Sequence, residues 1–254
     1  MFFTSLLQSN LKVKKFARNI IYYPRTESTS DDIWELYREN KDSTLLVISD
    51  YQTKGRGRFN KKWFSSPGVN LTFSFLLKDI YPDNKKNIIS LLIPLAIING
   101  VEKFTSIKLN LKWPNDIMYT NKKVGGVLIE SKINQKLKLY NIGIGLNVND
   151  DFHCYDNEIK DQATSLKLIK AYPIQREPLL ASILNELENL ISKKDEVNII
   201  KLWLDNCMHI NQNIKFHNKN KLIKGSFIDI NNKGEAVIQY ENSFLTYSGE
   251  IQLI

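Results

Sequence analysis

The chain has 254 residues, 43% of them hydrophobic and 24% charged, with a formal net charge of +8 at pH 7. These proportions are typical of a globular protein of one large domain, with or without a small appendage, and they exclude a largely disordered chain. The two cysteines, Cys154 and Cys207, have no neighbours at metal-ligand spacing, so we expect a reducing, cytoplasmic compartment and neither a disulfide framework nor a zinc site.

We expect neither a signal peptide nor a membrane-spanning segment. The N-terminus lacks a sustained apolar run followed by a small-residue cleavage site. The longest apolar segment, 88–98, is interrupted by Ser90 and Pro94 and is too short to cross a bilayer. The positive charge permits an anionic partner without identifying it, because the lysines are scattered along the chain.

The N-terminal part of the chain alternates between strand-like and helix-like segments. Segments 20–23 and 44–49 are apolar and rich in β-branched or aromatic residues, which predicts strands. Segment 70–77 alternates in polarity, which predicts a strand with one covered face. The hydroxyl residues 28–30 mark the start of a helix, and 86–104 suits a long helix.

The remaining segments predict an α+β fold with two domains. Further strands are expected over 109–113, 124–132 and 137–147, and helices over 175–192 and 196–206. After His209 the strands become short and are separated by tight turns, a pattern typical of a small β-barrel; they cover 214–216, 222–230, 236–240 and 244–249. We therefore expect a large domain over 1–209 and a small barrel domain over 210–254.

A loop over 53–63 contains five cations and two glycines, ends in Trp63 and has no acidic residue. Its glycines tolerate backbone conformations that let a chain wrap closely around a ligand. Its arginines carry planar guanidinium groups that suit phosphate or carboxylate oxygens. The loop therefore predicts an anion-binding site, although by itself it does not identify the anion.

Three further clusters are candidates for chemistry. In Lys112-Trp113-Pro114-Asn115-Asp116 the proline ends a strand and leaves an amide and a carboxylate in the turn; an ordinary turn is the favoured interpretation of this motif alone. In Lys123-Val124-Gly125-Gly126 the glycines allow a ligand close to the backbone, an interpretation equal in weight to a hairpin turn with surface lysines. In Gly143-Ile144-Gly145-Leu146-Asn147 the glycines leave room on one face of a buried strand.

Together, in this order and spacing, the clusters resemble the biotin–protein ligases. The resemblance extends from about Tyr22 to the C-terminus and depends on the Gly55-Arg56-Gly57-Arg58 loop, the Trp-Pro-Asn-Asp turn and the Lys-x-Gly-Gly strand. It implies a mixed sheet flanked by helices, like the catalytic domain of class II aminoacyl-tRNA synthetases, with a C-terminal SH3-like barrel.

The resemblance also implies a two-step reaction. Biotin's carboxylate attacks the α-phosphorus of ATP to give biotinyl-5′-AMP, and a lysine of a biotin carboxyl carrier protein or domain then attacks this acyl-adenylate. Biotin and ATP would be substrates and Mg²⁺ the activating ion, held mainly through the substrate phosphates, with no tightly bound prosthetic group. Fixed cations suit the first step because two anions must approach each other. No enzyme nucleophile is needed, which agrees with the lack of a Cys–His or Ser–His motif in the sequence.

Residue roles follow from the same resemblance. The catalytic residues would be Lys123, Arg56, Arg58 and Asp116. Biotin would be bound by these two arginines and Lys123 together with Ser28, Thr29, Ser30, Gln52, Gly55, Gly57, Gly125, Gly126 and Gly143. ATP would be bound by Arg56, Arg58, Trp63, Asn115, Lys123, Gly145 and Asn147, although an aromatic residue after a polar loop is more often a core anchor. Residues 55–62 would form a lid, and the three histidines are interpreted as structural or surface residues.

The sequence departs from the family pattern at two places. Ser30 stands where asparagine often follows Ser-Thr, so that contact with biotin is lost or replaced. Phe59-Asn60-Lys61 replaces the usual arginine- and glycine-rich continuation, while Lys61 and Lys62 retain the charge. The roughly twenty residues before the region of resemblance are too few for a winged helix-turn-helix, so we expect no DNA partner.

Two other classes of protein share some of these features. A lipoate–protein ligase would share the fold and the acyl-adenylate chemistry, but the Gly-Arg-Gly-Arg loop and the Trp-Pro-Asn-Asp turn argue against it. A nucleic-acid-binding module would explain the basic loop and its neighbouring aromatic residues, but not the glycine-containing strands downstream. Exposed sheet edges would permit a homodimer.

Overall fold

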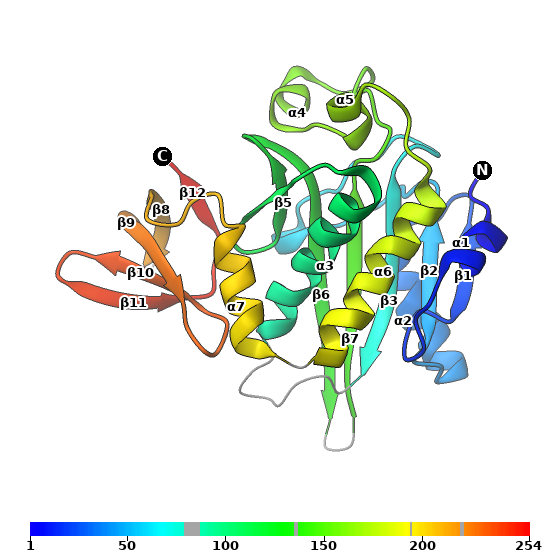
Figure 1. Cartoon of the computed structure of the whole chain (residues 1–254), viewed down its shortest axis with the longest axis horizontal. Helices are drawn as coiled ribbons and strands as arrows, with labels where there is room; N and C mark the ends of the chain where they lie inside the picture. The colour runs from blue at the N-terminus through cyan, green and yellow to red at the C-terminus, as the bar shows by residue number, and fades with distance from the viewer. Residues whose placement is uncertain (79–86, 135–136, 194, 219–220) are drawn as a thin grey trace.

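The computed structural model of the chain describes residues 1–78, 87–134, 137–193, 195–218 and 221–254. These residues form a seven-stranded mixed sheet flanked by helices and a second, five-stranded sheet towards the C-terminus (Figure 1). The larger sheet has the order β1-β2-β3-β7-β6-β5-β4. β1 and β2 are parallel, and the other neighbouring strands are antiparallel.

Six strands of the larger sheet correspond to predicted segments. They are β1 (Asn19–Tyr23), β2 (Leu45–Ser49), β3 (Leu71–Lys78), β4 (Asn110–Lys112), β6 (Lys122–Asn134) and β7 (Leu137–Leu146). The seventh, β5 (Asp116–Tyr119), was not predicted. The turn of the Trp-Pro-Asn-Asp motif is confined to residues 113–115, where the Trp113–Pro114 peptide bond is cis, and Asp116 already pairs with both neighbouring strands.

The two faces of this sheet are covered by different helices (Figure 1). The main core contains residues of α3 (Ile88–Thr105) and α6 (Arg176–Lys193) together with alternate residues of β2, such as Leu46. On the other face, Leu45 packs with Ile33 of α2 (Thr29–Asn40). β3 is therefore buried on both faces, and the prediction of a single covered face was wrong because its polar residues lie against the start of α2.

The helix α3 is the central element of the core. It is apolar enough, and at 18 residues long enough, to cross a membrane by length and composition, but 72% of this segment is buried within the protein. Gly100 allows α6 to approach closely, since a Cβ there would lie 2.5 Å from the Cα of Ile183. The predicted helices at 175–192 and 196–206 are confirmed as α6 and α7 (Glu196–Asp205).

Three short helices were not predicted. α1 (Thr4–Asn10) packs beside α6, where the backbone N–H of Phe3 donates a hydrogen bond to Glu177 at 2.8 Å. α4 (Asn157–Gln162) and α5 (Leu166–Lys170) follow β7 and lie beyond one end of the larger sheet (Figure 1). Each has fewer than eight residues, which is too short for a helical period of apolar residues to be visible in the sequence.

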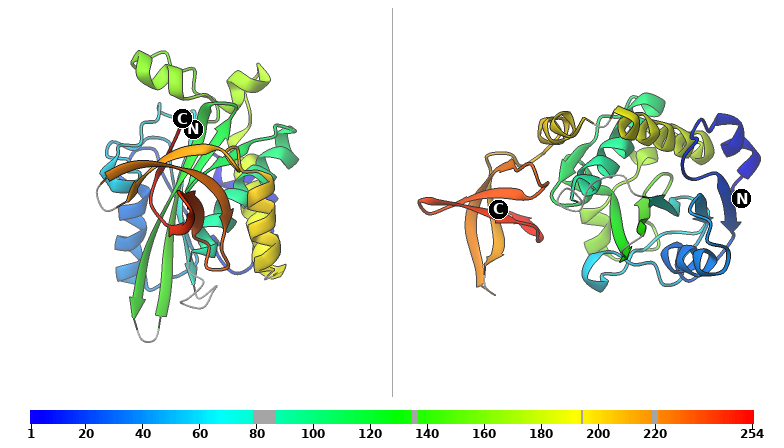
Figure 2. Two further views of the ribbon diagram at one scale, coloured as in Figure 1. Left: turned by 90° about the vertical axis from the view of Figure 1, so that its left-hand side faces the viewer. Right: turned by 90° about the horizontal axis from the view of Figure 1, so that it is seen from below.

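The five-stranded sheet stands to one side of the larger sheet and has the antiparallel order β11-β10-β9-β8-β12 (Figure 2). Its strands are β8 (Asn213–Asn218), β9 (Lys221–Ile230), β10 (Ala236–Tyr240), β11 (Ser243–Tyr247) and β12 (Ile251–Leu253). The expectation of a small C-terminal β domain is confirmed, while β12 was not predicted.

Trp113 joins the two sheets. Its ring packs edge-on against Trp203 of α7 at 5.8 Å between centroids and lies 5.9 Å from Phe227 of β9. Its Nε1–H donates a hydrogen bond to the backbone carbonyl of Gly249 at 2.9 Å. The segment between β11 and β12 is therefore held next to the Trp-Pro-Asn-Asp turn.

Candidate active site

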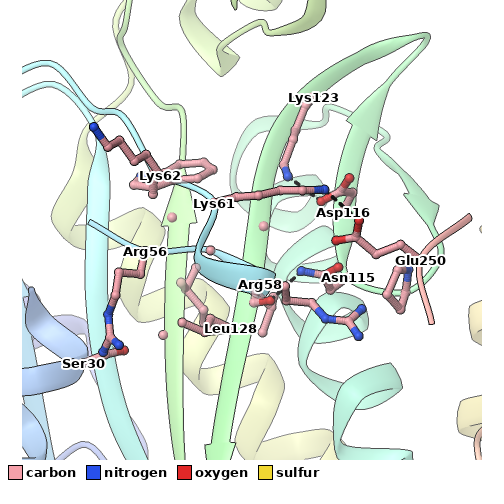
Figure 3. A pocket seen from close by; sticks show the side chains of 18 of the residues that line it. Ser30, Arg56, Arg58, Lys61, Lys62, Asn115, Asp116, Lys123, Leu128 and Glu250 are labelled. Atoms are coloured by element: carbon pink, nitrogen blue, oxygen red, sulfur yellow. Dashed lines mark hydrogen bonds and ion pairs between the residues drawn. The ribbon is translucent and has the colours of Figure 1, made fainter. Parts of the chain in front are cut away.

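A cavity of about 330 Å³ lies on the α2 side of the larger sheet (Figure 3). It brings together segments that are far apart in the sequence, including the C-terminal residues 250–252. Most of the predicted site residues line it: Ser28, Thr29, Ser30, Gln52, Arg56, Gly57, Arg58, Trp63, Asn115, Asp116, Lys123, Gly126, Gly143 and Gly145. Gly55, Gly125 and Asn147 do not line this cavity.

Gly125 lies on the opposite face of the sheet from Gly126. Side chains of successive strand residues point to opposite faces, so adjacent glycines cannot both line one cavity. A Cβ at Gly125 would meet Leu146 and Ile117 of the core, whereas a Cβ at Gly126 would meet the side chain of Lys123 at 3.4 Å. The expected contribution of Gly125 to a biotin slot therefore does not agree with the register of β6.

Polar groups form one end of the cavity. Gln52 accepts hydrogen bonds through Oε1 from the backbone N–H of Thr29 at 2.8 Å and from its hydroxyl at 3.0 Å. The hydroxyl of Ser74 lies 2.8 Å from that of Thr29 and 3.3 Å from that of Ser30. Ser28 is at the N-cap position of α2 but makes no side-chain capping bond, so this hydroxyl is not used by the helix.

Ser74 does not line the cavity but contacts two residues that do, and it was not predicted. It is fully buried in β3 and holds the hydroxyls of Thr29 and Ser30 side by side. A Cβ at Gly143 would lie 2.8 Å from Ser30 Oγ and 3.5 Å from Ser74 Oγ, so the glycine leaves room for both hydroxyls. A serine within an alternating strand gave no sequence signal beyond its polarity.

The Gly/Arg loop folds back on itself across the cavity. The N–H of Trp63 donates to the carbonyl of Gly55 at 2.9 Å, and the N–H of Gly57 donates to the carbonyl of Lys61 at 2.7 Å. Phe59 is at the tip, with a left-handed φ of 53° and an exposed ring. Gly55 closes the base of the loop, since a Cβ there would lie 2.7 Å from the carbonyl oxygen of Trp63.

The two arginines of the loop point in different directions (Figure 3). Arg56 forms an ion pair with Asp31 of α2 and lies 3.5 Å from Glu130 of β6. Arg58 points towards Asn115 and Glu250 (Figure 3). Burial lowers the pKa of Arg58 from its ordinary value, while the negative charges of Glu250 and Asp116 oppose that shift.

Lys123 and Asp116 form an ion pair at the other end of the cavity, with 2.5 Å between Nζ and Oδ1. The Lys123 side chain lies directly over Gly126, whose missing Cβ leaves that path open. Asn115 beside them is fixed by the backbone, because its amide donates to the carbonyl of Val127 at 2.7 Å. One end of the cavity therefore presents the hydroxyl and amide groups of Thr29, Ser30 and Gln52, and the other presents the ion pair of Lys123 and Asp116.

Trp63 separates this cavity from a second one of about 960 Å³, which it also lines. Its ring covers Gly145, where a Cβ would lie only 2.2 Å from Trp63 Cε2. Asn147 lines the second cavity, and its amide donates to the carbonyl of Thr164 at 3.2 Å. Lys123 and Asp116 are among the residues that border both cavities, so a ligand in either cavity can reach this ion pair.

The donor set does not form a resident metal site. Within the described ranges, no group of three or more His, Cys, Asp or Glu side chains could hold a metal ion. A Mg²⁺ ion at this site would therefore have to be coordinated chiefly by oxygens of a bound substrate, with Asp116 as a nearby carboxylate.

A buried Cys–His pair lies outside the cavity, in contrast to the expectation that the chain has no such arrangement. Cys207 Sγ is 3.5 Å from Nδ1 of His209, and the His209 ring packs edge-on against Phe227 at 4.6 Å between centroids. Burial raises the pKa of the Cys207 thiol to about 11 and lowers the pKa of His209 to about 4. Both groups are neutral near pH 7, so this pair does not provide a thiolate nucleophile.

Comparison with known proteins identifies relatives over most of the chain. The model of the biotin/lipoate A/B protein ligase family matches residues 22–149. The chain is 30% identical over 256 residues to the bifunctional ligase/repressor BirA of Bacillus subtilis, covering 98% of this chain and 78% of that protein. It is 26% identical over 220 residues to the biotin–protein ligase of Homo sapiens, covering 82% of this chain and 30% of that protein.

A solved structure supports the same relationship. The biotin protein ligase from Aquifex aeolicus in complex with biotin and ATP superimposes with a TM-score of 0.79 and 29% sequence identity, covering 93% of this chain and 99% of that chain. The expected fold class, a mixed sheet flanked by helices with a small C-terminal β domain, is confirmed by this match.

Proposed function

The chain belongs to the biotin/lipoate A/B protein ligase family, and from that premise we propose that it activates biotin with ATP and transfers the biotinyl group to a lysine of a carrier protein. The observation that carries this proposal is the polarity of the cavity along its length. One end presents the hydroxyls of Thr29 and Ser30 with the amide of Gln52, and the other presents Lys123. Biotin is complementary to this arrangement, because it has a polar ureido ring at one end and a carboxylate at the other.

In the first step, a carboxylate oxygen of biotin attacks the α-phosphorus of ATP. The bond from the α-phosphorus to the oxygen that bridges the α- and β-phosphates breaks. Pyrophosphate departs, and biotinyl-5′-AMP is the product. Lys123 carries a fixed positive charge between the two cavities, where the carboxylate and the α-phosphate would meet. A preorganised cation at this position stabilises charge that concentrates in the transition state, and such a group usually contributes a few kcal/mol.

In the second step, the ε-amine of the carrier lysine attacks the acyl carbon of the adenylate, an amide bond forms and AMP leaves. The lysine arrives as an ammonium ion and must lose a proton before it can attack. Asp116 is the carboxylate next to Lys123 and is partly exposed, so it can receive that ammonium group. Two protons leave the nitrogen: the first passes to a carboxylate or to solvent before the attack, and the second is lost to AMP or to solvent as the amide forms and AMP departs.

The carrier would be a biotin carboxyl carrier protein or the equivalent domain of a biotin-dependent carboxylase. Mg²⁺ would enter with the phosphates of ATP and neutralise charge on the leaving pyrophosphate. Both cysteines are free thiols, which supports a reducing, cytoplasmic location. Among the described residues, the edge strands β1 and β11 each pair with one strand only, and such edges support a homodimer as a further part of this proposal.

The family also includes lipoate ligases, and the polar end of the cavity favours biotin over lipoate. A ureido ring has two N–H donors and one carbonyl acceptor that can add hydrogen bonds to these hydroxyl and amide groups, whereas a dithiolane ring has no donor and only weakly accepting sulfur atoms. The discriminating experiment is ATP–pyrophosphate exchange with purified protein. Exchange that depends on biotin, and that lipoate does not replace, is the expected result; exchange with lipoate alone would reverse the assignment.

A further inference from the structure

An ion pair connects the lid, defined as residues 55–62, to the C-terminal sheet. Lys61 Nζ lies 2.7 Å from Oε2 of Glu250, which is separated from it by 189 residues in the sequence. Glu250 projects into the cavity towards Lys61 and Asp116 (Figure 3). The contact therefore joins a surface loop to a separate sheet across the mouth of the cavity. Surface loops are generally more mobile than sheets.

Glu250 is held by a rigid backbone. The hydroxyl of Tyr247 donates to the carbonyl of Glu250 at 3.1 Å, and the preceding carbonyl of Gly249 accepts a bond from Trp113 at 2.9 Å. Gly249 packs so tightly that a Cβ there would lie 2.3 Å from Tyr247 Oη. The next residue, Ile251, is buried and begins β12. The backbone of Glu250 is therefore held in place, and its carboxylate can hold Lys61 of the lid.

The lid has a second anchor on the opposite side. Arg56 pairs with Asp31 of α2, so one edge of the lid is bound to the larger sheet's helix and the other edge to the C-terminal sheet. Lys62, next to Lys61, has no carboxylate within ion-pair distance among the described residues. The charge on Glu250 also faces Arg58, the lid residue that points in the same direction.

We propose that Glu250 is a positioning residue that holds the lid across the cavity through Lys61, so that the C-terminal sheet helps to retain the acyl-adenylate. The part of this inference that concerns the adenylate rests on the proposed function; the part that concerns the lid does not. Both partners are partly exposed, at 66% and 35% of their side chains, so water screens the pair. The expected effect of breaking it is about two- to fivefold, the range measured for exposed ion pairs.

The test compares Glu250→Gln, Lys61→Gln and the double variant with the wild-type protein. Glu250→Gln preserves the shape of the side chain and lies outside the lid, so it does not alter the sequence that a protease reads. Chymotryptic cleavage after Phe59, whose ring is 70% exposed, reports lid opening in the ligand-free protein. The rate at which biotinyl-adenylate dissociates from the protein measures how well the lid retains it. The control is Glu186→Gln, which removes a similar ion pair with Lys103 on the far helices.

The expected result is that Glu250→Gln speeds cleavage after Phe59 about two- to fivefold and speeds adenylate release by a similar factor. The double variant should resemble the single variants, and the charge exchange Lys61→Glu with Glu250→Lys should restore much of the wild-type rate. Glu186→Gln should change neither rate. Cleavage at the wild-type rate in folded Glu250→Gln protein, or additive effects in the double variant, would overturn the inference.

The two proposals can fail separately. A wild-type protein without biotin-dependent exchange would contradict the proposed function, while cleavage of the ligand-free lid would still decide the role of Glu250. Normal adenylate formation with a lid that is insensitive to Glu250→Gln would contradict only the inference about the lid.

Discussion

Lys123 and Asp116 face each other because β6 contains a bulge. Met118 pairs with Lys123 while Ile117 pairs with Gly125, so Val124 has no partner in β5. In a regular strand Lys123 and Gly126 would point to opposite faces, because their positions differ by three, an odd number. The extra residue turns Lys123 onto the face that Gly126 occupies, and its Nζ comes within 2.5 Å of Asp116. In the Lys-x-Gly-Gly pattern, the first residue is therefore the lysine of the ion pair, the second is the bulge residue, and the last glycine leaves room for the lysine side chain.

Lys123→Ala should reduce biotinyl-adenylate formation by at least ~100-fold, the usual loss when a preorganised charge is removed from a reaction centre. The measurement is biotin-dependent ATP–pyrophosphate exchange, with the thermal midpoint as a check on folding. Lys122→Ala is the matched control, because Lys122 is adjacent but exposed and its ammonium group donates to the carbonyl of Lys160, outside the cavity. Near-normal exchange by folded Lys123→Ala protein would exclude the proposed role.

Gly145→Ala should raise the KM for both small substrates by about tenfold, because overpacking costs roughly 1–3 kcal/mol and the new methyl group collides with Trp63. The Cβ would lie 2.2 Å from Cε2 of that ring, which separates the two cavities. Steady-state kinetics measure the change. Adding Trp63→Phe should recover part of the loss by removing the colliding atoms; a double variant no better than Gly145→Ala would argue against this steric account.

Ser74→Ala should raise the KM for biotin about fivefold with little change in kcat, because the hydroxyls of Thr29 and Ser30 lose a buried partner worth about 1 kcal/mol. The control is Ser49→Ala, which removes another buried hydroxyl, one bonded to the carbonyl of Tyr51 away from the cavity. Both variants should lose similar stability, but only Ser74→Ala should weaken biotin binding. An equal effect on biotin from Ser49→Ala would show that the change is merely structural.

His209 should make the free energy of unfolding depend on pH. Its pKa falls from an ordinary 6.5 to about 4 in the folded protein because of burial and the nearby charge of Lys112. The unfolded chain therefore binds more protons between these values, so the stabilisation is fully present above pH 6.5 and is lost as the pH falls towards 4. The loss approaches ~3 kcal/mol.

Denaturant unfolding of the wild-type protein and His209→Gln over this pH range measures the effect. Acidic groups titrate equally in both proteins, so the difference between the two curves isolates His209. The variant should show a shallower decline in stability below pH 6.5. Parallel curves would mean that His209 is not held neutral by its surroundings.

Local patterns predicted most of the larger sheet and its long helices, because apolar periodicity reports which faces are buried. The chemical motifs likewise identified the residues that meet in the cavity, from Thr29 to Gly145. The bulge at Val124 was not predictable, since strand register depends on the partner strand. Ser74 was missed because its role comes from hydrogen bonds across 45 and 44 residues of sequence to Thr29 and Ser30.

Tertiary packing also explains the remaining differences. Cys207 and His209 are only two positions apart, but nothing in the sequence indicated that both would be buried and in contact with each other. Glu250 entered the cavity because Trp113 fixes the segment before β12, a contact across 136 residues. Such long-range placements depend on how the two sheets pack, which no local pattern specifies.

The most direct test of the central proposal is a single-turnover experiment with radiolabelled biotin, Mg-ATP and an excess of enzyme, followed by addition of a biotin carboxyl carrier domain. Labelled biotinyl-adenylate should first appear bound to the protein and should then pass to one lysine of the carrier, without further ATP. A protein that binds no labelled adenylate, or an adenylate that never transfers to the carrier lysine, would contradict the account.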